Sequence, residues 1–204
     1  MMDGTRRSFD LEAIRADFPI LSREVHGKPL VYLDSAASAQ KPAQVLDALM
    51  SAYQDTYANV HRGLHFLSEA STDLYEAVRG KVAGFIGAAS GDEIVLTSGA
   101  TMSLNLIARC WAQPRLQPGD EILISIAEHH ANIVPWQMVA EATGARVRAF
   151  TLEDDGAFSM ARLKAEMSER TRIISVPHVS NVLGTVFPVA EIAELAHDAG
   201  ALMV

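Results

Sequence analysis

Apolar positions in the second half of the chain form short runs that alternate with longer stretches of helical spacing. The apolar runs cover residues 93–97, 121–126, 146–150, 172–176 and 201–204. The amphipathic stretches between them cover residues 101–112, 132–143, 160–168 and 189–199. Strands that alternate with helices at this spacing are joined by crossover connections, which give a mostly parallel sheet with helices on both faces. The pattern therefore predicts an α/β fold.

The first ninety residues have a mainly helical pattern instead. A helix is predicted behind a cap at Asp10, a short strand at residues 30–33, and a helix whose first turn follows Pro42. A further helix is expected over residues 71–86. Its inward face would consist of Leu74, Val78, Val82 and Phe85.

Composition and charge exclude several classes of protein. The chain has 17 basic and 25 acidic side chains, a formal net charge of −8, and no cluster of Lys and Arg that could neutralise a run of phosphates. We therefore expect no nucleic-acid partner. No run of 18 apolar residues occurs, and the first residues lack the apolar centre of a secretory signal. The expected location is the cytoplasm, without a membrane association.

Cysteine and histidine are too sparse to indicate a disulfide or a metal site. Cys110 is the single cysteine, and its apolar surroundings predict a buried structural thiol. His129 and His130 are adjacent, without further ligands at metal-site spacing. The pair His61 and His65 lacks the glutamate of a metalloprotease helix and encloses Gly63. We expect no metal.

Polar and small residues follow three of the predicted strands. The segment SGAT (98–101) follows the first run, EHHAN (128–132) the second, and PHVSNVLG (177–184) the fourth. In an open α/β sheet, ligands bind beyond the carboxyl ends of the strands, so these loops are the candidate site. The sequence contains neither a dinucleotide-binding nor a nucleoside-triphosphate-binding glycine motif.

Taken alone, each of these segments has an ordinary structural interpretation beside the functional one. The small residues of SGAT suit an anion at a helix start, and they equally suit a capped turn. The adjacent imidazoles are either a platform for a flat aromatic ligand or exposed surface residues. The segment HRGLH (61–65) is either part of a site or a polar turn.

Five segments, in this order, resemble a SufS-type cysteine desulfurase of the class V aminotransferase family. They are YLDSAASAQKP (32–42), NVHRGLHFLSEASTDLYE (59–76), SGATMSLNLIA (98–108), EHHANIVPWQ (128–137) and HVSNVLGTVFP (178–188). EHHANIVPW and HVSNVLG are highly specific, whereas SGAT is not. The resemblance extends from Tyr32 to Val204 and implies the fold-type I architecture of pyridoxal-phosphate enzymes. It also implies a sheet that is incomplete at the C-terminus.

The resemblance implies a role for individual residues. Gly99, Ala100 and Thr101 would hold the cofactor phosphate, His129 would stack on the pyridine ring and take part in proton transfer, and Asn181 would bond the ring's phenolic oxygen. Two further groups are implied near the substrate and the dimer-built active site. These are Ala36 and Ala37 in one turn, and His61, Arg62 and His65 in another.

The implied activity is pyridoxal-phosphate-dependent removal of sulfur from L-cysteine. The products would be L-alanine and an enzyme persulfide, which a sulfur-acceptor protein would take into iron–sulfur cluster assembly. The resemblance also implies a homodimer. Residues 1–90 would supply small-domain and interface elements, and residues 91–204 would be the N-terminal part of the cofactor-binding large domain.

The chain departs from the family pattern in what it lacks. Relatives continue into segments that hold the aspartate pairing with the pyridine nitrogen, the Schiff-base lysine and, much later, the nucleophilic cysteine. None of the lysines follows a strand; they are Lys28, Lys41, Lys81 and Lys164. Ser98 and Met102 also flank the phosphate loop where relatives commonly have Arg and Glu. We therefore expect a fragment of a desulfurase that is inactive by itself.

Two other hypotheses remain open at this point. The chain could be a short protein that serves as a non-catalytic binding or interaction module. Alternatively, it could belong to a relative with the same fold and a different reaction, such as a selenocysteine lyase, a kynureninase or an aminotransferase.

Overall fold

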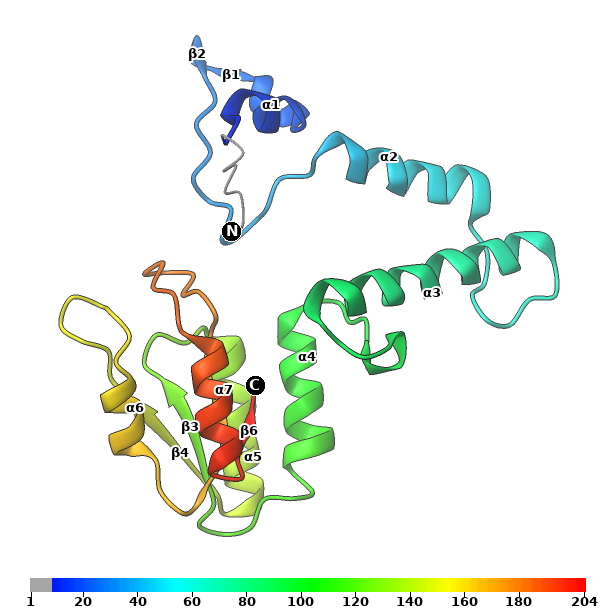
Figure 1. The fold of residues 1–204 in the computed structure, drawn as a ribbon. Coiled ribbons are helices and arrows are strands. Elements are labelled where there is room, and N and C mark those ends of the chain that lie inside the picture. Colours follow the sequence, from blue (N-terminus) through cyan, green and yellow to red (C-terminus); the bar gives the residue numbers. More distant parts are fainter. Residues whose placement is uncertain (1–8) are drawn as a thin grey trace, which may run out of the picture. The chain divides into compact units, whose positions relative to one another are not determined.

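The computed structural model describes residues 9–204, which form two compact units. The first extends to Leu96 and the second covers Thr97–Val204. Figure 1 shows the second unit as a sheet with helices, whereas the first consists mainly of helices. Each unit is described by itself below.

The second unit is built on a parallel four-stranded sheet. Its strands are β3 (Glu121–Ser125), β4 (Arg146–Phe150), β5 (Thr171–Ser175) and β6 (Leu202–Met203). They pair in parallel in the order β4-β3-β5-β6, so the two central strands are not consecutive in the sequence. The predicted α/β class with a mostly parallel sheet is confirmed, and four of the six predicted strands, those at 121–126, 146–150, 172–176 and 201–204, are present.

Helices cover both faces of this sheet. The helices are α4 (Ala100–Leu106), which continues as a π-helical segment Ile107–Ala112, α5 (Val134–Thr143), α6 (Met160–Glu166) and α7 (Val189–Asp198). In Figure 1, α7 passes in front of the strands and α5 passes behind them. Such a sheet is buried on both sides, which explains why its central strands have nearly continuous apolar sequences.

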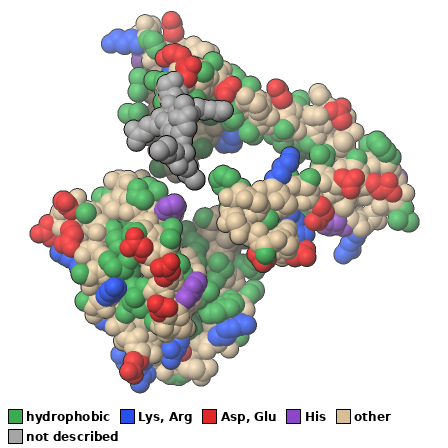
Figure 2. Space-filling view, in the orientation of Figure 1, with side chains coloured by type: hydrophobic (Ala, Val, Ile, Leu, Met, Phe, Trp, Pro, Cys, Tyr) green, Lys and Arg blue, Asp and Glu red, His purple; other side chains and the backbone are tan. Residues whose placement is uncertain are grey.

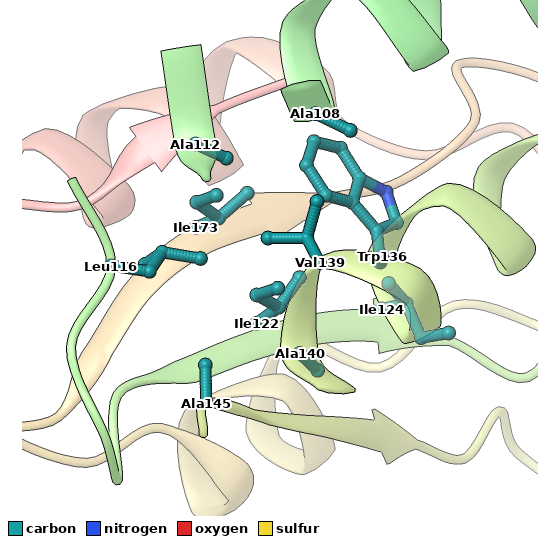
Figure 3. Packing of buried hydrophobic residues seen from close by; sticks show 10 residues of the cluster. All are labelled: Ala108, Ala112, Leu116, Ile122, Ile124, Trp136, Val139, Ala140, Ala145 and Ile173. Carbon is teal, nitrogen blue, oxygen red and sulfur yellow. The ribbon is translucent and has the colours of Figure 1, made fainter. Parts of the chain in front are cut away.

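Alternate residues of the strands enter two different cores. Ile122, Ile124 and Ile173 pack with residues from α5 and from the π-helical segment, around the indole of Trp136 (Figure 3). Leu123 and Ile174 point to the opposite face, where they pack with residues of α6 and α7. The alternation follows from the strand period of two residues, and it fixes the register of the sheet, because a one-residue slip would exchange the two cores.

Two helix ends follow the predicted glycine chemistry. Gly144 adopts φ 77° after α5, and its amide bonds the Ala140 carbonyl. Gly200 adopts φ 71° shortly after α7. Because left-handed backbone is unfavourable for residues with a Cβ, these positions let the chain leave each helix and enter the next strand.

The described part of the first unit, residues 9–96, contains three α-helices and a small hairpin. The helices are α1 (Leu11–Ala16), α2 (Ala43–Ser51) and α3 (Phe66–Ile86), and the hairpin pairs β1 (Glu24–Val25) with β2 (Lys28–Pro29). The Asp10 side chain caps α1 by accepting from the Ala13 amide at 3.0 Å, as predicted. α2 continues as a π-helical segment, Ala52–Thr56, and short 3-10 turns occur at Pro19–Ser22 and Gly91–Glu93.

Two predicted strands are wrong. Residues 30–33 have no regular structure. Of residues 93–97, Glu93 ends the 3-10 turn Gly91–Glu93, and residues 94–97 follow it without entering a sheet. Among the described residues neither segment has a neighbouring strand. Since a strand is stabilised by backbone hydrogen bonds to a partner, apolar β-forming residues alone do not produce one.

Two burial predictions are also wrong. The predicted inward face of α3 is open, with Phe85 91% and Leu74 54% exposed. Cys110 is exposed rather than buried, because Ala108 and Ala112 of the same segment occupy the face that packs on the sheet. Local apolar composition is therefore a poor guide when the helical phase or the covering element is not known.

The surface shows no helix suited to a bilayer. Within residues 9–204, none of the helices is both long enough and apolar enough to span a membrane. On the face of the molecule that Figure 2 shows, acidic and basic side chains are interspersed, and the basic ones do not merge into one surface.

An ion-pair cluster joins two strands and a helix at the amino ends of the strands. Arg148 on β4 bonds Glu121 on β3 at 3.2 Å and Glu166 on α6 at 2.5 Å. The Ser168 hydroxyl donates a further bond to Glu121 at 2.6 Å. Burial by itself would raise the pKa of Glu121, but the hydrogen bonds from Ser168 and Arg148 and the charge of Arg148 hold it below the ordinary value.

We predict that Glu121→Gln destabilises the fold in a pH-dependent way. A carboxyl whose folded-state pKa is lowered contributes stability above its unfolded value, near 4.5, and that contribution disappears as the pH falls through the folded value. Urea titration should show that the free energy of unfolding falls by about 1–2 kcal/mol at neutral pH. This difference should become smaller as the pH is lowered. The exposed Glu141 on α5 gives a matched control, Glu141→Gln. A loss that stays constant with pH would contradict the ion-pair interpretation.

Candidate active site

A cavity lies where the carboxyl ends of β3 and β5 meet the start of α4. Its volume is about 540 Å³, within the range of small-molecule sites, about 300–1,000 Å³. It is lined by Ala100, Thr101, Ser103, Leu104, Glu128, His129, Ala131, Asn132, Ser175, Val176, Pro177 and Val204. All three loops that the sequence placed at this edge of the sheet contribute residues to it.

The first loop brings backbone amides and a hydroxyl to the cavity. Gly99, at the N-cap of α4, has φ 146°, a conformation that favours glycine. Within the described part of the chain no side chain caps α4, so the first-turn N–H groups of Ala100 and Thr101 are available to a ligand. Asn105 Nδ2 donates to the Thr101 carbonyl at 2.8 Å, and the Thr101 hydroxyl has no hydrogen-bond partner within residues 9–204. Amides and a hydroxyl together suit a phosphate.

The second loop presents the imidazole of His129. The side chain is exposed, and its Nδ1 atom accepts a hydrogen bond from the Ala131 amide at 3.0 Å. Because a backbone N–H can only donate, Nδ1 must be the unprotonated nitrogen of the neutral ring, and the proton lies on Nε2. His130 meets His129 edge to face, with ring centroids 6.2 Å apart, and it is not among the residues that line the larger cavity.

Beneath His129, buried polar side chains connect the two central strands. Asn132 Oδ1 accepts from Trp136 Nε1 at 2.8 Å and from Ser175 Oγ at 2.6 Å. Asn132 Nδ2 donates to Glu128 Oε2 at 2.8 Å, and Ser125 Oγ donates to the other carboxylate oxygen at 3.0 Å. Ser125 ends β3 and Ser175 ends β5, so the network joins both strands to the loop between them.

Glu128 is the only acidic residue that lines the cavity in the described structure. Burial raises the pKa of its carboxyl, and the hydrogen bonds from Asn132 and Ser125 oppose this rise. Individual roles for Glu128, Asn132 and Ser175 were not predicted from the sequence. Two signals could have identified them: a serine at the end of an otherwise apolar strand, and the four-residue spacing that separates Glu128, Asn132 and Trp136.

Asn181 is not among the residues that line the cavity. It is exposed and belongs to the turn that follows β5, between Val179 and Val186, which pair in an antiparallel bridge. Ser180, its neighbour, is 3% exposed, and the Ser180 amide bonds the Thr185 carbonyl at 2.9 Å. The structure therefore brings Thr101 and His129 together, whereas it places Asn181 in a separate turn after the same strand as Ser175.

In the first unit, the HRGLH segment is fastened to α3. The His61 amide bonds Thr72 Oγ1 at 2.9 Å, and His61 Nε2 lies 2.8 Å from Glu76 Oε1. The Gly63 amide bonds the fully buried Ser68 at 3.0 Å, and a Cβ atom on Gly63 would overlap the Ser68 side chain. The segment thus requires glycine at this point.

This fastening leaves the predicted side chains outward. His61, with φ 69°, has left-handed backbone, which is uncommon outside glycine. Arg62 and His65 are both exposed, and His65 occupies the N-cap position of α3. The polar-turn interpretation and the functional one are both compatible with this geometry, because an exposed and rigid turn can also present side chains to a ligand.

The turn that contains Ala36 and Ala37 is also exposed. It is closed by hydrogen bonds from the Ala37 and Ser38 amides to the Asp34 carbonyl, at 3.2 and 3.0 Å. The Tyr32 hydroxyl braces the turn by bonding the carbonyls of Asp34 and Ser38. The small side chains of this turn leave its backbone accessible.

The chemistry of the cavity is that of a binding and proton-transfer site. It offers amide and hydroxyl donors, an exposed imidazole with a protonated Nε2, and a carboxylate. No lysine is among the residues that line it in the described part of the chain.

Comparisons with known proteins agree with this arrangement. The sequence profile of the family described as aminotransferase class V matches residues 31–204. The cysteine desulfurase of Enterobacter sp. (strain 638) is 52% identical over 194 residues, which are 95% of this chain and 48% of that protein. The probable cysteine desulfurase of Synechocystis sp. is 53% identical over 188 residues, or 92% of this chain and 45% of that protein. The chain spans about half the length of the curated relatives it matches.

Solved structures show the same likeness in three dimensions. The Escherichia coli cysteine desulfurase CsdA superimposes with a TM-score of 0.82 and 42% identity, covering 96% of this chain and 48% of that one. The apo cysteine desulfurase of Thermococcus onnurineus gives a TM-score of 0.85 and 35% identity, covering 95% of this chain and 46% of that one. The family and fold inferred from the sequence motifs are confirmed: the chain belongs to the class V aminotransferase family.

Proposed function

We propose that this chain forms part of a pyridoxal-phosphate-dependent cysteine desulfurase of the SufS type. The observation that carries the proposal is that Thr101 and His129 line one cavity at the carboxyl ends of β3 and β5. The similarity to cysteine desulfurases over nearly the whole chain supports it. The proposed reaction converts L-cysteine to L-alanine and leaves the sulfur on an enzyme cysteine as a persulfide.

The donor set of the cavity fits the proposed cofactor. A phosphate needs several N–H or O–H donors, and the start of α4 supplies the amides of Ala100 and Thr101 together with the Thr101 hydroxyl. An aromatic ring needs a flat partner, and the exposed imidazole of His129 lines the same cavity. The two ends of one elongated ligand would therefore meet two different kinds of group.

Bound pyridoxal phosphate would supply an electron sink for bond breaking in the amino-acid substrate. The residues of this chain orient and protonate. Thr101 and the amide of Ala100 anchor the phosphate end, and Gly99, whose own amide bonds Thr97 Oγ1 at 3.3 Å, supplies the φ 146° backbone that opens the start of α4 to the ligand. His129 stacks on the ring, and its Nε2–H, which the bond from Ala131 to Nδ1 leaves free, can deliver a proton beside it.

The remaining predicted residues belong to the same proposal. The Asn181 amide would donate to the phenolic oxygen of the cofactor. Ala36 and Ala37 would border the substrate, and the exposed His61, Arg62 and His65 would serve the active site of a dimer. Residues 1–90 and 91–204 would then correspond to interface elements and to part of the cofactor-binding domain.

We also propose a homodimer in which the first unit contributes to the interface. The open apolar surfaces of α2 and α3 support this, since Leu49 is 54% and Val78 44% exposed. Light scattering would test it, and a monomer mass at micromolar concentration would contradict it.

A sulfur-acceptor protein is the proposed second partner and the cytoplasm the proposed location. Persulfide transfer to the acceptor and cell fractionation are the respective tests.

The substrate is tested with the protein expressed from its complete reading frame. The rate of sulfide and alanine release from L-cysteine should exceed the rate of selenide release from L-selenocysteine. Preferential selenide release would favour a selenocysteine lyase instead. Absence of both products, together with absence of cofactor binding, would favour a non-catalytic binding module.

We predict that Thr101→Val weakens the binding of pyridoxal phosphate by about tenfold or more, because a hydrogen bond to a charged group contributes about 1.5–3 kcal/mol. Valine keeps the shape and removes the donor. Equilibrium dialysis with pyridoxal, which lacks the phosphate, is the matched control and should show little change. An equal effect on both ligands would contradict the placement of Thr101 at the phosphate.

We predict that His129→Ala weakens the binding of both pyridoxal phosphate and pyridoxal by about two- to tenfold. This is the range expected for the loss of one aromatic stacking contact. His130→Ala removes the adjacent imidazole, which lies outside the lining of the larger cavity, and should have a smaller effect. If the two variants bound both ligands equally well, His129 would not be the ring partner.

A further inference from the structure

The network below His129 has a fixed direction. Trp136 is fully buried, and its indole Nε1 can only donate, so the Asn132 atom that it contacts at 2.8 Å must be the amide oxygen. The amide nitrogen of Asn132 therefore points to Glu128. Glu128 accepts at both of its carboxylate oxygens, from Asn132 and from Ser125. Every bond in the chain of donors is directed toward the carboxylate.

This network closes the loop that carries His129. The bond between Glu128 and Asn132 joins residues four apart, and His129 lies between them. Inside this closed loop the backbone N–H of Asn132 donates to the His129 carbonyl at 2.8 Å. The backbone N–H of Ala131 donates to His129 Nδ1 at 3.0 Å. Because Asn132 is 7% exposed and is tied to β5 through Ser175, the loop is anchored in the protein interior. His129 thereby gains a fixed ring orientation at an exposed position.

We propose that Asn132 and Glu128 are positioning residues that hold the His129 imidazole at the rim of the cavity, with Nε2 protonated and free for a bound ligand. This inference deepens the proposed function and rests on it for the identity of the ligand. The raised pKa of Glu128 agrees with a carboxylate that is partly buried. The two residues act through His129, since their polar atoms are occupied by one another and by Ser125, Ser175 and Trp136.

The alternative is that the network only stabilises the sheet. A purely structural role predicts a lower unfolding midpoint in variants, with an unchanged His129 ring in the molecules that remain folded. A positioning role predicts a change at the imidazole itself. Imidazole nitrogen resonances of protein labelled with 15N-histidine report the tautomer and the Nδ1 hydrogen bond, so they separate the two roles without any ligand.

The test reverses the polarity of one hydrogen bond. Asn132→Asp keeps both acceptor contacts with Trp136 and Ser175 and replaces the donor to Glu128 by a second carboxylate. Adding Glu128→Gln restores a donor, because the new amide can donate to the aspartate and accept from Ser125. Adding Glu141→Gln instead removes the same charge from an exposed position on α5 and restores no bond. Far-UV circular dichroism verifies folding, and Glu128→Ala replaces the first variant if it does not fold.

We expect Asn132→Asp to shift the His129 nitrogen resonances and to weaken the binding of pyridoxal phosphate about two- to tenfold. Glu128→Gln in the same chain should restore both, whereas Glu141→Gln should restore neither. Unchanged His129 resonances in folded Asn132→Asp protein, or equal rescue by both second substitutions, would overturn the inference. If the native protein binds no pyridoxal phosphate, the proposed function fails, and the resonances still decide whether the network positions His129.

Discussion

The parallel pairing of β5 beside β3 is the constraint on which the candidate site depends. Parallel neighbours end at the same edge of a sheet, so the segments that follow Ser125 and Ser175 are brought together although about fifty residues separate them in sequence. The register of this pair is secured by the two apolar cores on opposite faces of the sheet. Loss of this pairing would separate His129 from the loop after β5, so the cavity is a consequence of the core packing.

The same edge solves a second physical problem, which is how to bury polar groups next to a binding cavity. Ser125, Asn132 and Ser175 are nearly inaccessible to solvent, and each has a hydrogen-bond partner. A buried amide without partners would cost about 1–3 kcal/mol, so a complete network is needed if the strand ends are to be polar. Because Trp136 also belongs to the apolar core shown in Figure 3, the network connects the core directly to the loop that presents His129.

The sequence was sufficient to predict what depends on local pattern. The parallel sheet, the helices around it, the glycine-terminated α5 and the position of His129 beyond the end of β3 follow from periodicity and from the rule for ligands in α/β folds. Thr101 lines the same cavity although the strand predicted before it, at 93–97, is absent from the described residues. Predictions that required knowledge of a distant partner were wrong. The expected strand at 93–97 has no neighbour to pair with among the described residues, Phe85 has nothing over it, and Cys110 faces outward because of the helix phase. The roles of Glu128 and Asn132 were missed because side-chain hydrogen bonds leave little trace in hydrophobic patterns.

We propose that the cavity between the start of α4 and His129 holds a phosphorylated aromatic ligand. A crystal structure of the protein with pyridoxal phosphate tests it most directly. Phosphate oxygens should lie within hydrogen-bonding distance of Thr101 Oγ1 and the neighbouring amides, with the pyridine ring stacked on the His129 imidazole. A ligand bound at another site, or bound in this cavity with its phosphate away from Thr101, would contradict it.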